Sequence, residues 1–182
     1  MKPGARESRG GSAAPALGFR RVLLAVAGAA AIALLAVPVT ASSAQFVWNL
    51  SHSAPRGLYR IERGGWSVGD RVAILPSQVL AADLADRGVL QNGKLLIKLV
   101  AASTGDKVCR RHLETSINDR VVAQAKPTGA NGSLLPSWQG CTTLDDGQVF
   151  LLGDTAESYD GRYFGITSAT EVIGRAVGVV TF

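Results

Sequence analysis

The chain has 182 residues, of which 47% are apolar and 18% charged, and it carries a formal net charge of +5. This length is typical of one domain with a short appendage and excludes a large multidomain assembly. The apolar content excludes an intrinsically disordered protein, which combines low hydrophobicity with high net charge.

The basic charge is concentrated at the N-terminus. Residues 1–21 contain five of the 19 basic residues and one of the 14 acidic residues, a net charge of +4. Residues 22–182 keep 14 basic and 13 acidic residues, a net charge of only +1. Because this part has no basic stripe interleaved with aromatic residues, we predict no nucleic-acid partner.

The 18 residues of segment 22–39 are apolar, with the sequence VLLAVAGAAAIALLAVPV. As a helix this segment would span about 27 Å, close to the hydrocarbon thickness of a bilayer. We predict a transmembrane anchor at residues 22–41, with the basic tail 1–21 in the cytoplasm and residues 42–182 outside it. The alternative is a cleavable secretory signal ending near Ala41, although its apolar core would exceed the usual length of about 7–15 residues.

Beyond the anchor, short β-type runs alternate with turns rich in glycine and proline. Strands are predicted at residues 57–62, 71–75, 94–100, 107–110, 121–125, 148–152 and 176–182. One helix is predicted at residues 78–85, with Ser77 as its N-cap. Residues 42–182 are therefore expected to form one mainly β domain.

The two cysteines, Cys109 and Cys141, form an even pair in a segment expected outside the cytoplasm, where a disulfide persists. Closing a loop of about 30 residues would contribute about 3–4 kcal/mol. The alternative is a zinc site that adds His112 as a ligand. No second ligand pair with suitable spacing follows, so we predict a disulfide and no metal.

Segment 49–59, NLSHSAPRGLY, places Ser51 and Ser53 two residues apart in an uncharged stretch just before Pro55. Segment 94–101, KLLIKLVA, reads as a strand in which apolar residues flank Lys98 on its own face. Burial there would lower the lysine pKa, as a lysine general base requires. The alternative is an edge-strand lysine whose amine reaches water.

Segment 152–165, LGDTAESYDGRYFG, follows a predicted strand and contains Asp154, Ser158, Asp160 and Arg162. An Asp160–Arg162 pair can brace this loop, which leaves Ser158 free to orient another polar group. Taken alone, the segment has no assigned purpose.

In this order, the three segments resemble the signal peptidase I clan of membrane-anchored Ser/Lys proteases (S26-type), and most closely its TraF-type branch associated with conjugative transfer. The serine block of that branch, Asn-x-Ser/Thr-x-Ser-x-Pro-x-Gly-x-Tyr, matches residues 49–59 throughout. The lysine block corresponds to residues 98–106, and the last block, Gly-Asp-Asn-x-x-x-Ser-x-Asp-Ser/Gly-Arg-x-x-Gly, to residues 153–165 with Thr155 in place of Asn.

The resemblance implies a signal-peptidase-like, β-rich catalytic domain behind one transmembrane helix, in the bacterial inner membrane and facing the periplasm. It implies Ser53 as the nucleophile and Lys98 as its general base. The Ser51 hydroxyl and the Ser53 N–H would form the oxyanion hole, and Ser158 would orient the Lys98 amine. The last group of residues would support the loop: Asp154, Asp160 and Arg162.

The resemblance also implies a protein substrate, an exported precursor such as a conjugative pilin, and no metal or organic cofactor. A serine nucleophile forms an ester with the substrate. Water would release a cleaved product from this ester and an amine of the substrate would release a cyclic one, and both outcomes stay open at this point.

Two alternatives to a Ser/Lys peptidase are a hydrolase with a histidine base and a protein without enzymatic activity. A Ser-His-Asp hydrolase would need His52, which adjoins Ser53 and is poorly placed to bond it, or His112, which follows two arginines. A non-enzymatic, membrane-anchored subunit of a secretion or pilus assembly would need no chemistry at all. The joint presence of Ser53, Lys98 and Ser158 favours the peptidase.

Overall fold

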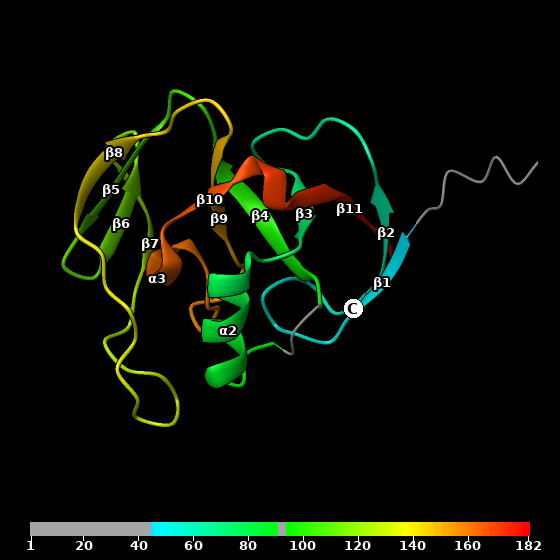
Figure 1. Ribbon diagram of the computed structural model, residues 1–182, viewed down its shortest axis with the longest axis horizontal. Coiled ribbons are helices and arrows are strands. Elements are labelled where there is room, and N and C mark those ends of the chain that lie inside the picture. Colours follow the sequence, from blue (N-terminus) through cyan, green and yellow to red (C-terminus); the bar gives the residue numbers. More distant parts are fainter. Residues whose placement is uncertain (1–44, 91–93) are drawn as a thin grey trace, which may run out of the picture. The chain divides into compact units, whose positions relative to one another are not determined.

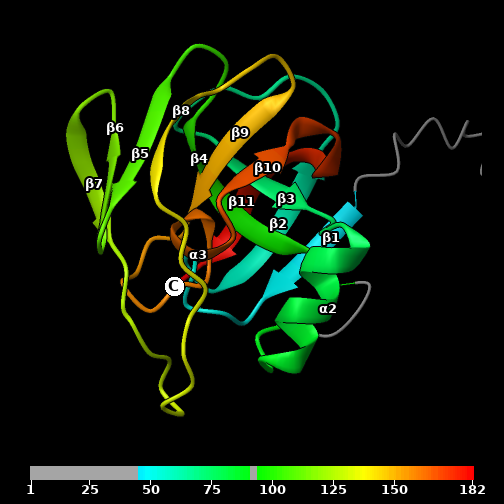
Figure 2. The same ribbon diagram turned by 60° about the vertical axis from the view of Figure 1, so that its left-hand side comes forward.

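The computed structural model describes residues 45–90 and 94–182, which form two antiparallel β-sheets (Figures 1 and 2). Within these residues, the large sheet has seven strands in the order β1-β2-β11-β3-β4-β9-β10. Its strands are β1 (Gln45–Asn49), β2 (Gly57–Glu62), β3 (Arg71–Ile74), β4 (Leu96–Ala102), β9 (Gln148–Leu152), β10 (Ile166–Ser168) and β11 (Val172–Thr181).

The small sheet has four strands among the described residues, in the order β7-β6-β5-β8. They are β5 (Lys107–Arg111), β6 (Glu114–Ile117), β7 (Arg120–Gln124) and β8 (Gly140–Thr143). Three short helical elements complete this part of the chain: α2 (Gln78–Asp86), α3 (Gly161–Phe164) and the 3-10 turn η1 (Ala169–Glu171).

The core forms where apolar residues alternate along the strands of the large sheet. In β2, Tyr59 and Ile61 are buried while Arg60 between them is exposed. Strands β4 and β9 lie inside the sheet and are buried over most of their length, as a strand covered on both faces must be. Lys98 therefore lies on a buried central strand, and the third segment begins where another one ends.

The predicted ranges of β2 and β9 agree with the structure, and α2 follows Ser77, although the Ser77 side chain makes no capping hydrogen bond. Strand β4 lies two residues beyond its predicted start and end, and β11 begins at Val172 rather than at residue 176. The sequence pattern predicts none of the elements at Gln45–Asn49, Glu114–Ile117, Gly140–Thr143, Gly161–Phe164 and Ile166–Ser168.

Cys109 on β5 and Cys141 on β8 lie directly opposite each other in the small sheet and form a disulfide, with their Cα atoms 4.0 Å apart. The adjacent Arg110 is buried and donates to the backbone carbonyls of Arg162 and His112. The small sheet is thus bonded to α3, which belongs to the third segment singled out in the sequence.

Among the described residues, no helix is both long enough and apolar enough to cross a membrane. The predicted tail and anchor, residues 1–21 and 22–41, lie outside the described residues.

Candidate active site

The loop that follows β1 is organised by the side chain of Asn49. Its amide nitrogen donates to the carbonyls of Ser51, Ala54 and Pro55, each at 3.1 Å. Its amide oxygen accepts from the Ser51 N–H at 3.2 Å and from the Ser51 hydroxyl at 2.8 Å. A single buried amide therefore fixes the turn that carries Ser53, a role of Asn49 that the motif alone does not predict.

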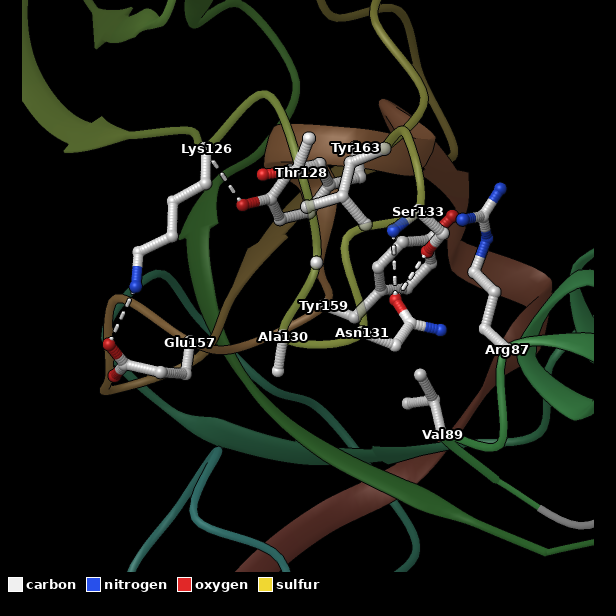
Figure 3. Close-up of a pocket in the computed structure, with 12 residues that line it drawn as sticks. Arg87, Val89, Lys126, Thr128, Ala130, Asn131, Ser133, Glu157, Tyr159 and Tyr163 are labelled. Atoms are coloured by element: carbon white, nitrogen blue, oxygen red, sulfur yellow. Dashed lines mark hydrogen bonds and ion pairs between the residues drawn. The ribbon is translucent and has the colours of Figure 1, made fainter.

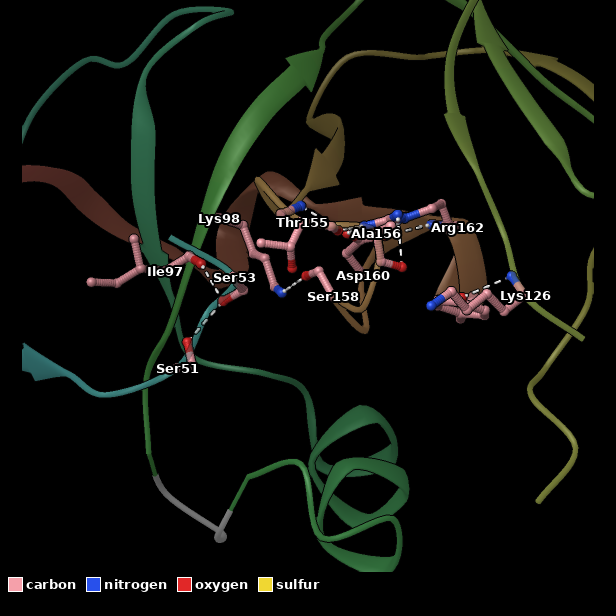
Figure 4. Close-up of polar contacts among 12 residues, drawn as sticks. Ser51, Ser53, Ile97, Lys98, Lys126, Thr155, Ala156, Ser158, Asp160 and Arg162 are labelled. Carbon is pink, nitrogen blue, oxygen red and sulfur yellow. Dashed lines mark hydrogen bonds and ion pairs between the residues drawn. The ribbon is translucent and has the colours of Figure 1, made fainter. Parts of the chain in front are cut away.

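Ser53 is buried in the loop that follows β1, beside β4 (Figure 4). Its Oγ lies 2.9 Å from Ser51 Oγ and donates a long hydrogen bond of 3.4 Å to the carbonyl of Ile97. Among the described residues, the Ser53 N–H makes no hydrogen bond. This N–H and the Ser51 hydroxyl, which lies beside the Ser53 oxygen, are two donor groups that could bind an anionic oxygen.

Lys98 lies near the middle of β4, and its side chain is 2% exposed. Its Nζ donates to Ser158 Oγ at 2.7 Å. Burial in apolar surroundings lowers the pKa of Lys98 from 10.5 to about 8, against the opposing effect of the nearby Asp160 carboxylate. The predicted burial of Lys98 is therefore confirmed, and the edge-strand alternative is wrong, because β4 lies between β3 and β9.

The third segment is braced by an ion pair inside the protein. Asp160 and Arg162 approach to 2.6 Å, and their side chains are 0% and 4% exposed. Arg162 also donates to the carbonyl of Thr155 at 2.6 Å, and Asp160 accepts from the Gly153 N–H at 2.7 Å. These bonds fix both ends of the loop that carries Ser158, as the sequence predicted for this pair.

The first and third segments are also bonded directly. The Asp154 N–H donates to the Ser53 carbonyl at 2.9 Å, while the Asp154 carboxylate pairs with Arg71 at 2.6 Å on the surface. Asp154 therefore positions the backbone of Ser53 and lies away from its hydroxyl, in agreement with a structural rather than a chemical role.

Gly153 lies where Ser158 and Ser53 approach each other. A Cβ atom added at Gly153 would lie 2.0 Å from Ser158 Oγ and 3.1 Å from Ser53 Cβ. Only glycine leaves room for both serines at this point. The motif in the sequence contains Gly153 but does not indicate this contact.

The three segments line one groove of about 570 Å³. It contains Ser51, Ser53, Lys98 and Ser158, while Asp160 and Arg162 are buried behind it (Figure 4). No hydrogen bond joins Lys98 to Ser53 within the described residues, and the amine donates to Ser158 instead. The arrangement brings a hydroxyl, a poorly solvated amine and free backbone N–H together, as acyl transfer requires.

The residues of the alternative chemistries are placed differently. The exposed His52 lies against Arg56, with Nε2 2.6 Å from the guanidinium, while the contacts of Ser53 Oγ are with Ser51 and Ile97. Cys109 and Cys141 are bonded to each other and are not free thiolates. Within residues 45–90 and 94–182, no group of three or more His, Cys, Asp or Glu side chains could hold a metal ion.

Comparison with known proteins adds independent information. The sequence model of the family described as signal peptidase, peptidase S26, matches residues 19–181. The chain is 34% identical to the conjugal transfer protein TraF of Agrobacterium tumefaciens (strain 15955), over 90% of this chain and 97% of the relative. It is 29% identical to a plasmid transfer protein TraF of Escherichia coli, over 82% and 89%. A signal peptidase I from Enterococcus faecalis V583 covers 62% of this chain and 97% of its own, with 21% identity and a TM-score of 0.38.

Proposed function

Since the chain belongs to the signal peptidase family, peptidase S26, we propose that it is a membrane-anchored serine endopeptidase in which Ser53 and Lys98 form the catalytic dyad. The observation that carries this proposal is the Lys98 amine, 2% exposed and with a pKa lowered to about 8, in the same groove as the Ser53 hydroxyl. With this pKa about a tenth of the amine is neutral at pH 7, far more than of an ordinary lysine, and its lone pair can then accept a proton.

In the proposed reaction, Ser53 Oγ attacks the scissile carbonyl carbon and its proton passes to Lys98 Nζ. The C–N bond then breaks, and Nζ returns the proton to the leaving amine, which leaves an ester on Ser53. Ser158 accepts a hydrogen bond from the Lys98 amine at 2.7 Å and thereby orients the lone pair of that nitrogen towards Ser53. Attack by water on the ester completes hydrolysis.

The oxygen of the tetrahedral intermediate would be bound by the Ser53 N–H and the Ser51 hydroxyl. Donors of this kind typically contribute about 10²–10³-fold each to the rate. The Ser51 hydroxyl donates to Asn49 at 2.8 Å, and its one proton cannot serve both acceptors. Ser51 would therefore rotate towards the oxyanion as negative charge develops, so that its bond strengthens in the transition state.

We place the enzyme in the bacterial inner membrane, with residues 22–41 as the anchor and the catalytic domain in the periplasm. The hydropathy and charge of residues 1–41 support this placement. Alkaline carbonate extraction tests the anchor. The protein should stay with the membrane fraction, and its release would instead support a cleaved signal.

The names of the relatives, conjugal and plasmid transfer proteins, support a role in conjugation. We propose an exported precursor as the substrate, specifically a conjugative pilin precursor, as the motif resemblance implies. The ester on Ser53 can react with water, which gives a cleaved product. It can also react with an amine of the same substrate, which gives a cyclic product one water lighter than the cleaved chain. Product masses distinguish the two.

The deciding experiment co-expresses this pilin precursor with wild type, Ser53→Ala, Lys98→Ala and His52→Ala, and measures the precursor and product by mass spectrometry. Wild type and His52→Ala should process the precursor, because His52 is exposed and bonded to Arg56. Ser53→Ala and Lys98→Ala should not. Processing by either of them would refute the dyad, and loss of activity in His52→Ala would favour a histidine base.

A further inference from the structure

A second cavity of about 470 Å³ adjoins the catalytic groove (Figure 3). Its buried floor is formed by Tyr159 and Tyr163, whose rings stack with centroids 5.2 Å apart. One wall is the segment that links β7 to β8, including Ala130 and Leu135. The cavity has no part in the proposed chemistry, since it contains none of the residues assigned to that chemistry.

The wall is a formed hairpin, which we define as residues 126–135. The Gly129 N–H donates to the Ser133 carbonyl at 2.8 Å, and the Leu135 N–H donates to the Pro127 carbonyl at 3.0 Å. The Lys126 N–H donates to the Tyr163 hydroxyl at 3.0 Å, which joins the hairpin to the floor. These bonds hold the cavity open without a ligand, so binding there would require little ordering of the protein.

The charges around the cavity are paired with each other. Lys126 and Glu157 form an ion pair at 2.9 Å on one side. Arg87 on the other side lies over the Tyr159 ring, 5.4 Å from its centroid, and pairs with Asp83 at 2.7 Å. Because each cation already has its anion, the cavity favours an uncharged, apolar group over a charged one.

The cavity adjoins the catalytic groove, because Val89, Glu157 and Tyr159 line both. Glu157 and Tyr159 are the immediate neighbours of Ser158, which bonds the Lys98 amine. A polypeptide extended through the groove advances about 3.3 Å per residue, so a few residues take it from the scissile bond past this shared wall.

We infer that the cavity under the hairpin 126–135 is a remote subsite for the substrate polypeptide itself. This inference rests on the proposed function. The subsite takes an uncharged stretch of the precursor, a few residues from the scissile bond, and seats one large apolar side chain on the Tyr159–Tyr163 floor. Burying such a side chain strengthens binding about 10- to 100-fold. The enzyme would thereby recognise its substrate by this distant apolar side chain as well as by the residues next to the scissile bond.

The test uses the full chain in detergent with Ser53→Ala, which should bind the pilin precursor without cutting it. Amide hydrogen exchange is measured with and without the precursor. Slower exchange in both 49–55 and the hairpin 126–135 is the expected result. Slower exchange in 49–55 alone would overturn the subsite and leave the proposed function standing. No change in either segment would refute the proposed substrate and the subsite together.

The matched variants place tryptophan at two points on the same hairpin. Ala130→Trp fills the cavity, whereas Leu134→Trp replaces a side chain that is 79% exposed and does not line it. With the otherwise wild-type enzyme, Ala130→Trp should raise KM for the precursor about 10- to 100-fold at unchanged kcat. Leu134→Trp should leave both values unchanged. Equal KM values for the two variants would overturn the inference.

Discussion

Replacing the proposed general base should make the protein more stable while it abolishes peptidase activity. Burial lowers the pKa of Lys98 from 10.5 in water to about 8 in the folded protein. Between these values the unfolded chain binds more protons than the folded one, so stability rises with pH over this interval. Below about pH 8 the lysine is protonated in both states, and the folded protein carries the full penalty of a buried ammonium group.

The size of the effect follows from the two pKa values. Lowering a pKa from 10.5 to about 8 corresponds to about 3 kcal/mol of destabilisation at pH 7. Lys98→Met removes this penalty and keeps an unbranched apolar side chain, but it loses the hydrogen bond to Ser158, which contributes about 1 kcal/mol. We expect Lys98→Met to be about 2 kcal/mol more stable than wild type at pH 7.

Guanidinium unfolding of the full chain in detergent, with the disulfide intact, measures this difference. The advantage of Lys98→Met should shrink as the pH rises from about 8 and disappear by about pH 10.5, because the folded lysine is then neutral and the unfolded lysine is losing its proton. The exposed Lys94 supplies the matched control, and Lys94→Met should have wild-type stability. Lower stability of Lys98→Met at pH 7, or a gain independent of pH, would refute the argument that desolvation dominates at this site.

Three further predictions concern rate, positioning and the disulfide. The wild-type kcat/KM should rise with pH through about 8 as the buried amine loses its proton, and a profile that falls over this range would exclude a lysine base. Gly153→Ala should lower kcat about 100-fold, because the added Cβ displaces Ser158. Gly65→Ala, which has open space around it, should keep the wild-type kcat, and equal kcat values for the two variants would refute the close approach at Gly153. Replacing Cys109 and Cys141 by serine should lower the unfolding free energy by about 3–4 kcal/mol, and unchanged stability would show that the cross-link contributes nothing.

The sequence predicted those strands whose side chains follow a clear pattern. Strand β2 alternates buried and exposed residues, and β9 is a continuous apolar run after an Asp-Gly turn, so both were located within their observed bounds. Strand β8, Gly140–Thr143, is exposed along its length and has no such pattern. Its position depends on pairing with β5, which the sequence of β8 alone does not encode.

The same distinction applies to the active site. Three ordered motifs predicted which residues to consider, since each motif is local. They did not predict the contacts of Asn49 within its turn or the close approach at Gly153, because these depend on how distant segments meet. A motif identifies a glycine or an amide, and only the packed structure shows what it touches.

The meeting of the segments follows from strand register. Leu99 of β4 pairs with Leu152 at the end of β9, so Lys98 lies beside the point where β9 stops and Gly153 begins the third segment. A shift of one residue in this register would turn Lys98 to the opposite face of the sheet. The amine would then lose Ser158, and the pKa would no longer be lowered by this burial. The chemistry proposed for this chain therefore depends on a pairing between residues about fifty positions apart, which hydrophobic burial of both strands specifies.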